Sequence, residues 1–108
     1  MHSLTMPVFG LAVLPDRSSV LVRIEGELDL ATAPRVGEAV QELREVGWDE
    51  IVLDLGAADF VDSTGLRLLL EIQAQARRED WRFALQGECG AFDRLLCVPG
   101  LRDWFTRA

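Results

Sequence analysis

The sequence predicts an α/β domain in which a mixed four- to five-stranded sheet is flanked by helices. Apolar segments with the alternating period of a strand recur between segments with the 3.6-residue period of a helix. Their order is strand, strand, helix, strand, helix, strand, helix. Strands joined by helices of this length are usually parallel with right-handed crossovers. The 108 residues suit one domain with a single core, so we expect residues 1–108 to form one unit.

The first two strands are predicted to form a hairpin. Residues 7–14 are mostly apolar, and residues 15–18 form a turn. In the second strand Val20, Val22 and Ile24 alternate with Leu21, Arg23 and Glu25, as expected when one face lies in a core. We expect residues 26–29 to end this strand, because glycine at position 26 permits a sharp change of direction.

The next helix has recognisable signals at both ends. Thr32 is a candidate cap, and Pro34 suits the first turn, where a missing N–H costs nothing. Gly47 is a typical stop signal. Helical spacing relates five apolar residues that we expect on the core side, namely Val36, Ala39, Val40, Leu43 and Val46.

Residues 51–55 are almost uniformly apolar, as expected for a central strand covered on both faces. A linker over residues 56–59 leads to an acidic, hydroxyl-rich turn, Asp62-Ser63-Thr64-Gly65, and then to an apolar helix. Asp, Ser and Thr satisfy the free N–H groups at a helix start. In that helix the core side is predicted to carry Leu68, Leu69, Ile72 and Ala76, with Leu66 and Leu70 flanking them and Arg67, Glu71, Gln75 and Arg78 opposite.

The C-terminal part is predicted to contain one more strand and a short helix. Residues 81–85 form the strand, residues 87–90 a turn, and residues 91–98 a helix stopped by Pro99 and Gly100. Residues 101–105 form a last helical or irregular piece.

Charge and composition exclude several classes of function. The net charge is −7, and all 11 basic residues are arginine, so we expect no nucleic-acid partner. No apolar run approaches the roughly 20 residues that span a bilayer, and there is no signal peptide, so we expect no membrane association and a cytoplasmic location. Cys89 and Cys97 are interpreted as reduced packing residues.

Catalysis by Ser63 is not expected. A nucleophilic serine needs a base, and the sequence has only His2 and no lysine. Asp54, Asp59 and Asp62 do not have the spacing of a calcium loop, and residues 87–90 lack the pattern of a phosphate loop. We therefore expect no enzyme, metal site or cofactor, although the sequence does not exclude a nucleotide.

The Ser63 hydroxyl remains a candidate acceptor of a phosphoryl group. A phosphate there would lie at a helix N-terminus, which tolerates negative charge. It would add about −1.5 to −2 charge beside Asp59 and Asp62. A partner that contacts this turn would then have to desolvate added bulk and charge.

The segments 20–29 (VLVRIEGELD), 51–55 (IVLDL) and 60–70 (FVDSTGLRLLL) resemble the STAS domain, specifically bacterial anti-sigma-factor antagonists. The order and spacing of these segments agree along nearly the whole chain. The resemblance implies a STAS-like fold and a protein that, unphosphorylated, binds an anti-sigma factor and so releases a sigma factor. It also implies that the anti-sigma factor is a serine kinase, that a metal-dependent phosphatase reverses its action, and that Ser63 is the serine modified.

We expect a partner-binding surface composed of Asp29, Asp62, Ser63, Thr64, Gly65, Leu66 and Arg67. The resemblance implies that Asp29 and Asp62 line the phosphorylation site, and the start of the helix places Leu66 and Arg67 beside Ser63. Two alternatives remain open, a STAS subunit of a lipid-transport ATPase whose surface is not phosphorylated, and a STAS domain that binds a small ligand such as a nucleotide. Whether the chain forms a homodimer is also left open.

Overall fold

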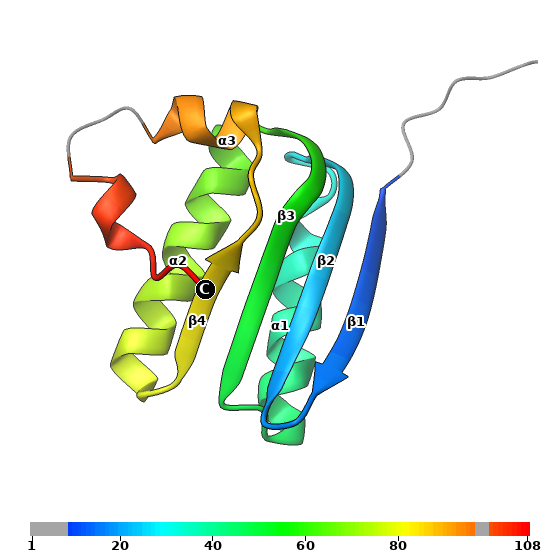
Figure 1. The fold of residues 1–108 in the computed structure, drawn as a ribbon, viewed down its shortest axis with the longest axis vertical. Helices are drawn as coiled ribbons and strands as arrows, with labels where there is room; N and C mark the ends of the chain where they lie inside the picture. Colours follow the sequence, from blue (N-terminus) through cyan, green and yellow to red (C-terminus); the bar gives the residue numbers. More distant parts are fainter. Residues whose placement is uncertain (1–8, 97–99) are drawn as a thin grey trace, which may run out of the picture.

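The computed structural model describes residues 9–96 and 100–108, which form a four-stranded sheet in the order β1-β2-β3-β4. β1 pairs antiparallel with β2, whereas β2–β3 and β3–β4 are parallel, which confirms the predicted mixed sheet. Two long helices and two short helical segments complete the fold (Figure 1). The elements are β1 (Gly10–Asp16), β2 (Ser19–Leu28), α1 (Ala33–Val46), β3 (Glu50–Val61), α2 (Ser63–Glu79), β4 (Arg82–Gln86), α3 (Gly90–Leu95) and a 3₁₀ turn η1 (Arg102–Trp104).

The opening hairpin forms, but its turn is shorter than predicted. Pro15 pairs with Val20 and Asp16 with Ser19, so only two residues remain for the turn. Pro15 is tolerated because β1 is an edge strand and needs no N–H there. The predicted start of this strand at position 7 lies outside the described residues.

The second strand ends at Leu28, within the predicted residues 26–29, whereas the predicted end of the third strand is wrong. Gly26 does not end β2, since the strand continues to Leu28 with register shifts on either side of this glycine, whose φ is 92°. The predicted linker over residues 56–59 is part of β3, where Ala58 pairs with Gly26. The left-handed glycine lets β2 absorb an irregularity, so both strands extend to the turns that carry the candidate site.

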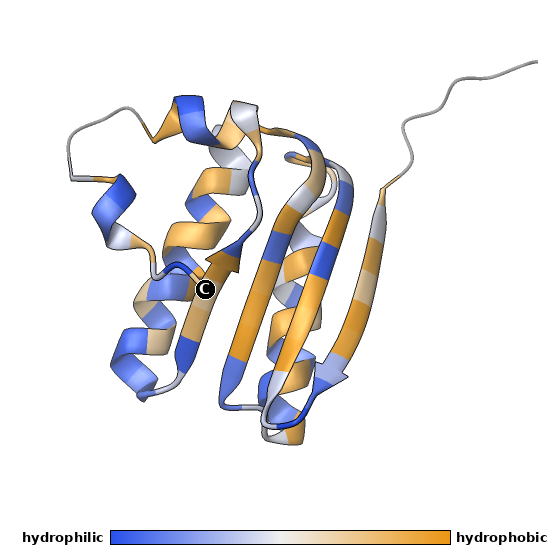
Figure 2. Cartoon of the chain, in the orientation of Figure 1, coloured by the Kyte–Doolittle hydropathy of each residue, from blue (hydrophilic) through white to orange (hydrophobic). Residues whose placement is uncertain are grey.

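Both long helices cover the same face of the sheet (Figure 1). In β3 the side chains of Ile51, Leu53 and Leu55 are buried, while Val52 and Asp54 are only half-buried. The prediction that this strand is covered on both faces is therefore wrong. Figure 2 shows a largely apolar β3 interrupted by hydrophilic residues, the composition on which that prediction rested.

Helix α1 has the predicted ends and most of the predicted core face. Pro34 lies in its first turn, and Gly47 ends it with a φ of 114°. Val36 and Val40 are buried, but Val46 is 78% exposed, so its predicted place on the core side is wrong. In α2 the predicted core positions hold, because Leu69, Ile72 and Ala76 are buried. Leu68 there is half-buried.

The C-terminal residues run along the free edge of β4. The Leu85 N–H donates to the Thr106 carbonyl oxygen and the Leu85 carbonyl accepts from the Ala108 N–H, both at 2.8 Å. Buried Gln73 of α2 accepts from the Thr106 N–H at 3.2 Å. Phe105 packs edge-on against Phe92 of α3. The predicted short helix is present but begins at Gly90, and its predicted end at Val98 lies outside the described residues.

Candidate functional site

The Asp62-Ser63-Thr64-Gly65 segment is the first turn of α2 rather than a loop before it. Asp62 is the N-cap residue, with an extended backbone, and its side chain accepts from the Gly65 N–H at 2.9 Å. β3 does not continue past Asp62, because the next residue already has helical geometry. The predicted capping role is thus filled by the aspartate, which leaves the Ser63 hydroxyl unused as a cap.

Gly65 is fixed in this turn by close packing against the end of β2. A Cβ atom at this position would lie 2.7 Å from the Leu28 carbonyl oxygen and 3.1 Å from Cγ1 of Val61. Real Cβ atoms do not approach a backbone oxygen so closely, so only glycine brings α2 this near to β2. The Asp62 N–H also donates to the same Leu28 carbonyl at 3.1 Å.

The residues between and after Asp62 and Gly65 differ in their exposure to solvent. Ser63 and Arg67 are exposed, whereas Thr64 and Leu66 are half-buried. Leu66 packs against the core. Of the two hydroxyls in this turn, that of Ser63 is therefore the one more open to another protein.

Asp29, which the family resemblance places at the site, holds the turn between β2 and α1. Its Oδ1 accepts from the Ala31 N–H at 3.0 Å and from the Thr32 N–H at 3.1 Å. The Thr32 hydroxyl donates to the Glu27 carbonyl at 2.7 Å and accepts from the Asp29 N–H at 2.9 Å. Thr32 occupies the N-cap position as predicted, but its side chain holds this turn and does not cap α1.

The two turns meet at the same end of the sheet, just beyond the last residues of β2 and β3. Leu28, which precedes Asp29, accepts the hydrogen bond of Asp62, so Asp29 and the Ser63 turn lie at the adjacent ends of β2 and β3. The structure thus brings all the predicted partner-binding residues into two touching turns. Their role in binding stays a prediction.

Sequence reasoning missed two apolar residues beside these turns. Leu30 is 73% exposed and Phe60 is 43% exposed. Leu30 directly follows Asp29, and Phe60 pairs with Glu27 near the end of β3. A single exposed apolar residue produces no periodic pattern, so no sequence signal was available for either of them.

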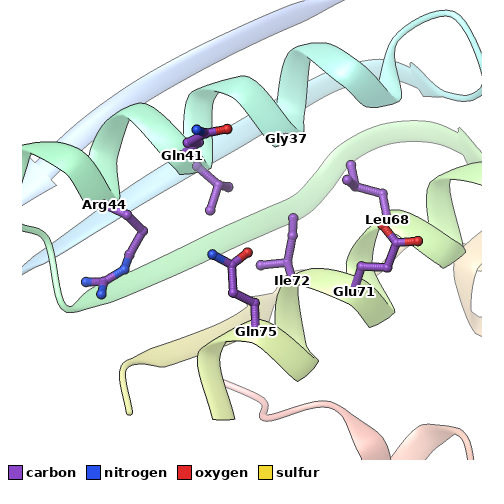
Figure 3. A pocket seen from close by; sticks show the side chains of 8 residues that line it. Gly37, Gln41, Arg44, Leu68, Glu71, Ile72 and Gln75 are labelled. Atoms are coloured by element: carbon purple, nitrogen blue, oxygen red, sulfur yellow. The ribbon is translucent and has the colours of Figure 1, made fainter. Parts of the chain in front are cut away.

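Two hollows lie along the contact between α1 and α2. One, of about 210 Å³, adjoins the first turn of α2 and is lined by Leu30, Ala33, Pro34, Thr64, Arg67, Leu68 and Glu71. The other, of about 320 Å³, lies farther along the two helices (Figure 3). Its polar lining includes Gln41, Arg44 and Gln75. Arg44 is already engaged there, since its Nη1 donates to the Trp48 carbonyl at 2.7 Å and pairs with Asp49 at 2.9 Å.

The described part of the chain offers little for catalysis. It contains neither histidine nor lysine to serve as a base for Ser63. Within the same residues, no group of three or more histidine, cysteine or acidic side chains is placed to hold a metal ion. Cys89 is buried as a free thiol, as predicted, whereas Cys97 lies outside the described residues. Among described helices, none has the length and apolar character needed to cross a bilayer.

The family model described as "Mlab, STAS domain" matches residues 12–106. The chain belongs to the STAS domain family. The similarity thus covers most of β1, the other three strands and both long helices of this STAS domain, including the two turns of the candidate site.

Named relatives and solved structures agree with this assignment. The anti-sigma-B factor antagonist of Staphylococcus aureus (strain NCTC 8325 / PS 47) is 30% identical over 82 residues, which are 76% of each chain. The anti-sigma factor antagonist from Mycobacterium paratuberculosis has a crystal structure that superposes with a TM-score of 0.76 at 25% identity, covering 94% of this chain and 87% of the other. The Bacillus cell fate determinant SpoIIAA in its phosphorylated form, at 22% identity, shares the fold of this STAS domain with a TM-score of 0.70, over 94% and 91% of the two chains.

Proposed function

We propose that this STAS domain is an anti-sigma factor antagonist that is switched by phosphorylation of Ser63. The unphosphorylated chain binds an anti-sigma factor and thereby releases a sigma factor. The anti-sigma factor is also the serine kinase, and a metal-dependent phosphatase restores the free hydroxyl. Relatives named anti-sigma-B factor antagonist support the class of function.

We choose Ser63 as the phosphorylated residue because it is exposed between two residues that are held in place. Asp62 caps α2 and Gly65 packs on Leu28, so the backbone on both sides of the serine is held in place. The serine hydroxyl itself is exposed and is not used in the cap. A kinase can therefore reach it without unfolding the helix.

In the proposed modification, the Oγ atom of Ser63 forms a bond to the γ-phosphorus of ATP as the bond to the β-phosphate oxygen breaks. ADP leaves, and the hydroxyl proton passes to the base that the kinase supplies. The phosphatase uses water to release inorganic phosphate and regenerate the serine.

The phosphate changes the surface more than the fold. It adds about −1.5 to −2 charge at the N-terminus of α2, where the helix dipole stabilises an anion. Asp59 and Glu27 are exposed near the ends of β3 and β2, close in sequence to the two turns, so the partner meets a more negative surface. A loss of about 3 kcal/mol in binding corresponds to a roughly hundredfold weaker complex, which is sufficient for a switch.

The test uses the purified chain, each purified anti-sigma factor kinase from the same organism, and ATP. We expect wild type to bind one of these kinases and to be phosphorylated at Ser63, as located by mass spectrometry. S63A should bind with similar affinity and remain unmodified. S63E should bind about a hundredfold more weakly, and T64A, the matched control, should still be modified at Ser63.

Three results would contradict the proposal. Phosphate on Thr64 would refute the site. Co-purification of a transporter ATPase rather than a kinase, with wild type and S63A alike and with no phosphate on Ser63, would favour a subunit of a transport assembly. Heat of binding for GTP or ATP in calorimetry, with no affinity for any anti-sigma factor, would favour a ligand-binding domain.

A further inference from the structure

The smaller hollow between α1 and α2 is mainly apolar. Four of its lining residues are Leu30, Ala33, Pro34 and Leu68, and the remaining three are Thr64, Arg67 and Glu71. Thr64 directly follows Ser63, so the hollow borders the residue proposed to be phosphorylated. Leu30 stands at its edge with 73% of its surface exposed.

The size of this hollow favours a protein side chain over a small molecule. Its volume is about 210 Å³, whereas small-molecule sites usually have about 300–1,000 Å³. It also has few polar groups to orient a ligand. One apolar side chain of a partner protein fits these dimensions, and Leu30 would lose its contact with water when that side chain enters.

The surrounding charge favours a basic partner over a second copy of this chain. Glu71 lines the hollow, and Glu27, near the end of β2, accepts a hydrogen bond at its carbonyl from Thr32 of the turn that contains Leu30; both glutamates are exposed. Among the described residues that line the hollow, Arg67 is the only basic one. The chain has a net charge of −7, so two copies would approach this surface against their mutual repulsion.

We propose that this hollow receives an apolar side chain of the anti-sigma factor, flanked there by basic residues, and that Leu30 packs against it. The proposal rests on the function proposed above and adds a specific contact to it. Thr64 forms one wall of the hollow, so a phosphate on Ser63 lies at its border and impedes the same contact. Recognition of the partner and its release by phosphorylation thus share one surface.

Substitution of Leu30 tests this contact. L30S removes the exposed apolar side chain and should weaken binding of the anti-sigma factor kinase, the one that binds wild type, by about tenfold to a hundredfold. L30M keeps an apolar side chain of similar volume and should recover most of the affinity. Calorimetry gives the dissociation constants, and thermal unfolding checks that each variant is folded.

V46S is the matched control, because Val46 is another highly exposed apolar residue, at the opposite end of α1 (Figure 1). It should change the affinity less than twofold. If wild type binds and L30S binds within twofold of it, the contact is refuted while the proposed function stands. If no anti-sigma factor kinase binds wild type, both fail. A concentration-dependent dimer that L30S abolishes would instead identify a second copy as the occupant and overturn the proposal.

Discussion

The main-chain N–H of Asp62 donates to the Leu28 carbonyl oxygen at 3.1 Å, and this bond joins the two turns of the candidate site. The same carbonyl lies where a Cβ on Gly65 would be. β2, through Leu28, therefore positions the residues on both sides of Ser63. Substitutions that loosen this junction should affect stability and recognition together. Substitution of the exposed serine by alanine should leave the free energy of unfolding nearly unchanged.

Removing the Asp62 cap should destabilise the domain. D62A leaves the Gly65 N–H without its side-chain acceptor and should lower the free energy of unfolding by about 1 kcal/mol. D62N is the control, because asparagine caps as well as aspartate without the charge. Urea unfolding measures both. Equal stability of D62A and wild type would show that the cap contributes nothing.

Substitution of Gly65 by alanine should be more damaging. The new Cβ would lie 2.7 Å from a backbone oxygen, so α2 must shift, and overpacking of this kind costs about 1–3 kcal/mol. G37A is the matched control in α1. Its Cβ would meet only Leu68 Cδ1 at 3.4 Å, and alanine raises helix propensity there by up to about 1 kcal/mol. Thermal unfolding should rank G37A at or above wild type and G65A clearly below it. The reverse order would contradict this account.

Arg67 should respond to a phosphate on Ser63. The two residues are four apart on α2 and both are exposed, so their side chains lie on the same helix face. Phosphorylation should raise the midpoint of thermal unfolding, since the phosphate meets both the helix N-terminus and this guanidinium. R67A should lose part of that increase at low salt, while R78A, near the other end of α2, should keep it. An identical increase in R67A would exclude the pair.

The Gln73 side chain should keep the C-terminal residues paired with β4. Q73L removes the acceptor of the Thr106 N–H and should cost about 1–3 kcal/mol, because that donor is left unpaired at a partly buried position. Hydrogen exchange should become faster at the Leu85 and Ala108 amides, because their hydrogen bonds join β4 to the C-terminal residues. Q75L, in the same helix but only half-buried, is the control. Unchanged exchange in Q73L would mean that the β4 pairing holds without Gln73.

The sequence was sufficient to predict the order of the elements and the first turn of α2. Pro34 and Gly47 identify the limits of α1, and Asp62 with its neighbours identifies the start of α2, because these residues act through local backbone chemistry. The extension of β3 through residues 56–59 was not predictable in this way. Its Gly-Ala-Ala-Asp composition has low strand propensity, and pairing with β2 overrides that preference.

Only part of the candidate site could be predicted, because only part of it is formed by local contacts. Ser63 stands in a local motif, and the Asp29 carboxylate is likewise bound locally by the Thr32 N–H three residues on. That these two turns meet depends instead on the pairing of β2 with β3, which no local signal shows. Leu30 was missed because its exposure depends on packing between α1 and α2 rather than on periodicity. Val46 was misplaced because helical spacing alone does not show where the sheet ends beneath α1.

The C-terminal residues on β4 make the two edges of the sheet unequal. In the described part of the chain, one edge is occupied at Leu85 by backbone pairing, whereas β1 has no strand on its outer side. A copy that added to β1 by antiparallel pairing would use the β1 edge of both molecules. Growth of such a pair beyond two copies by strand addition would have to use the β4 edge, where Leu85 is already paired.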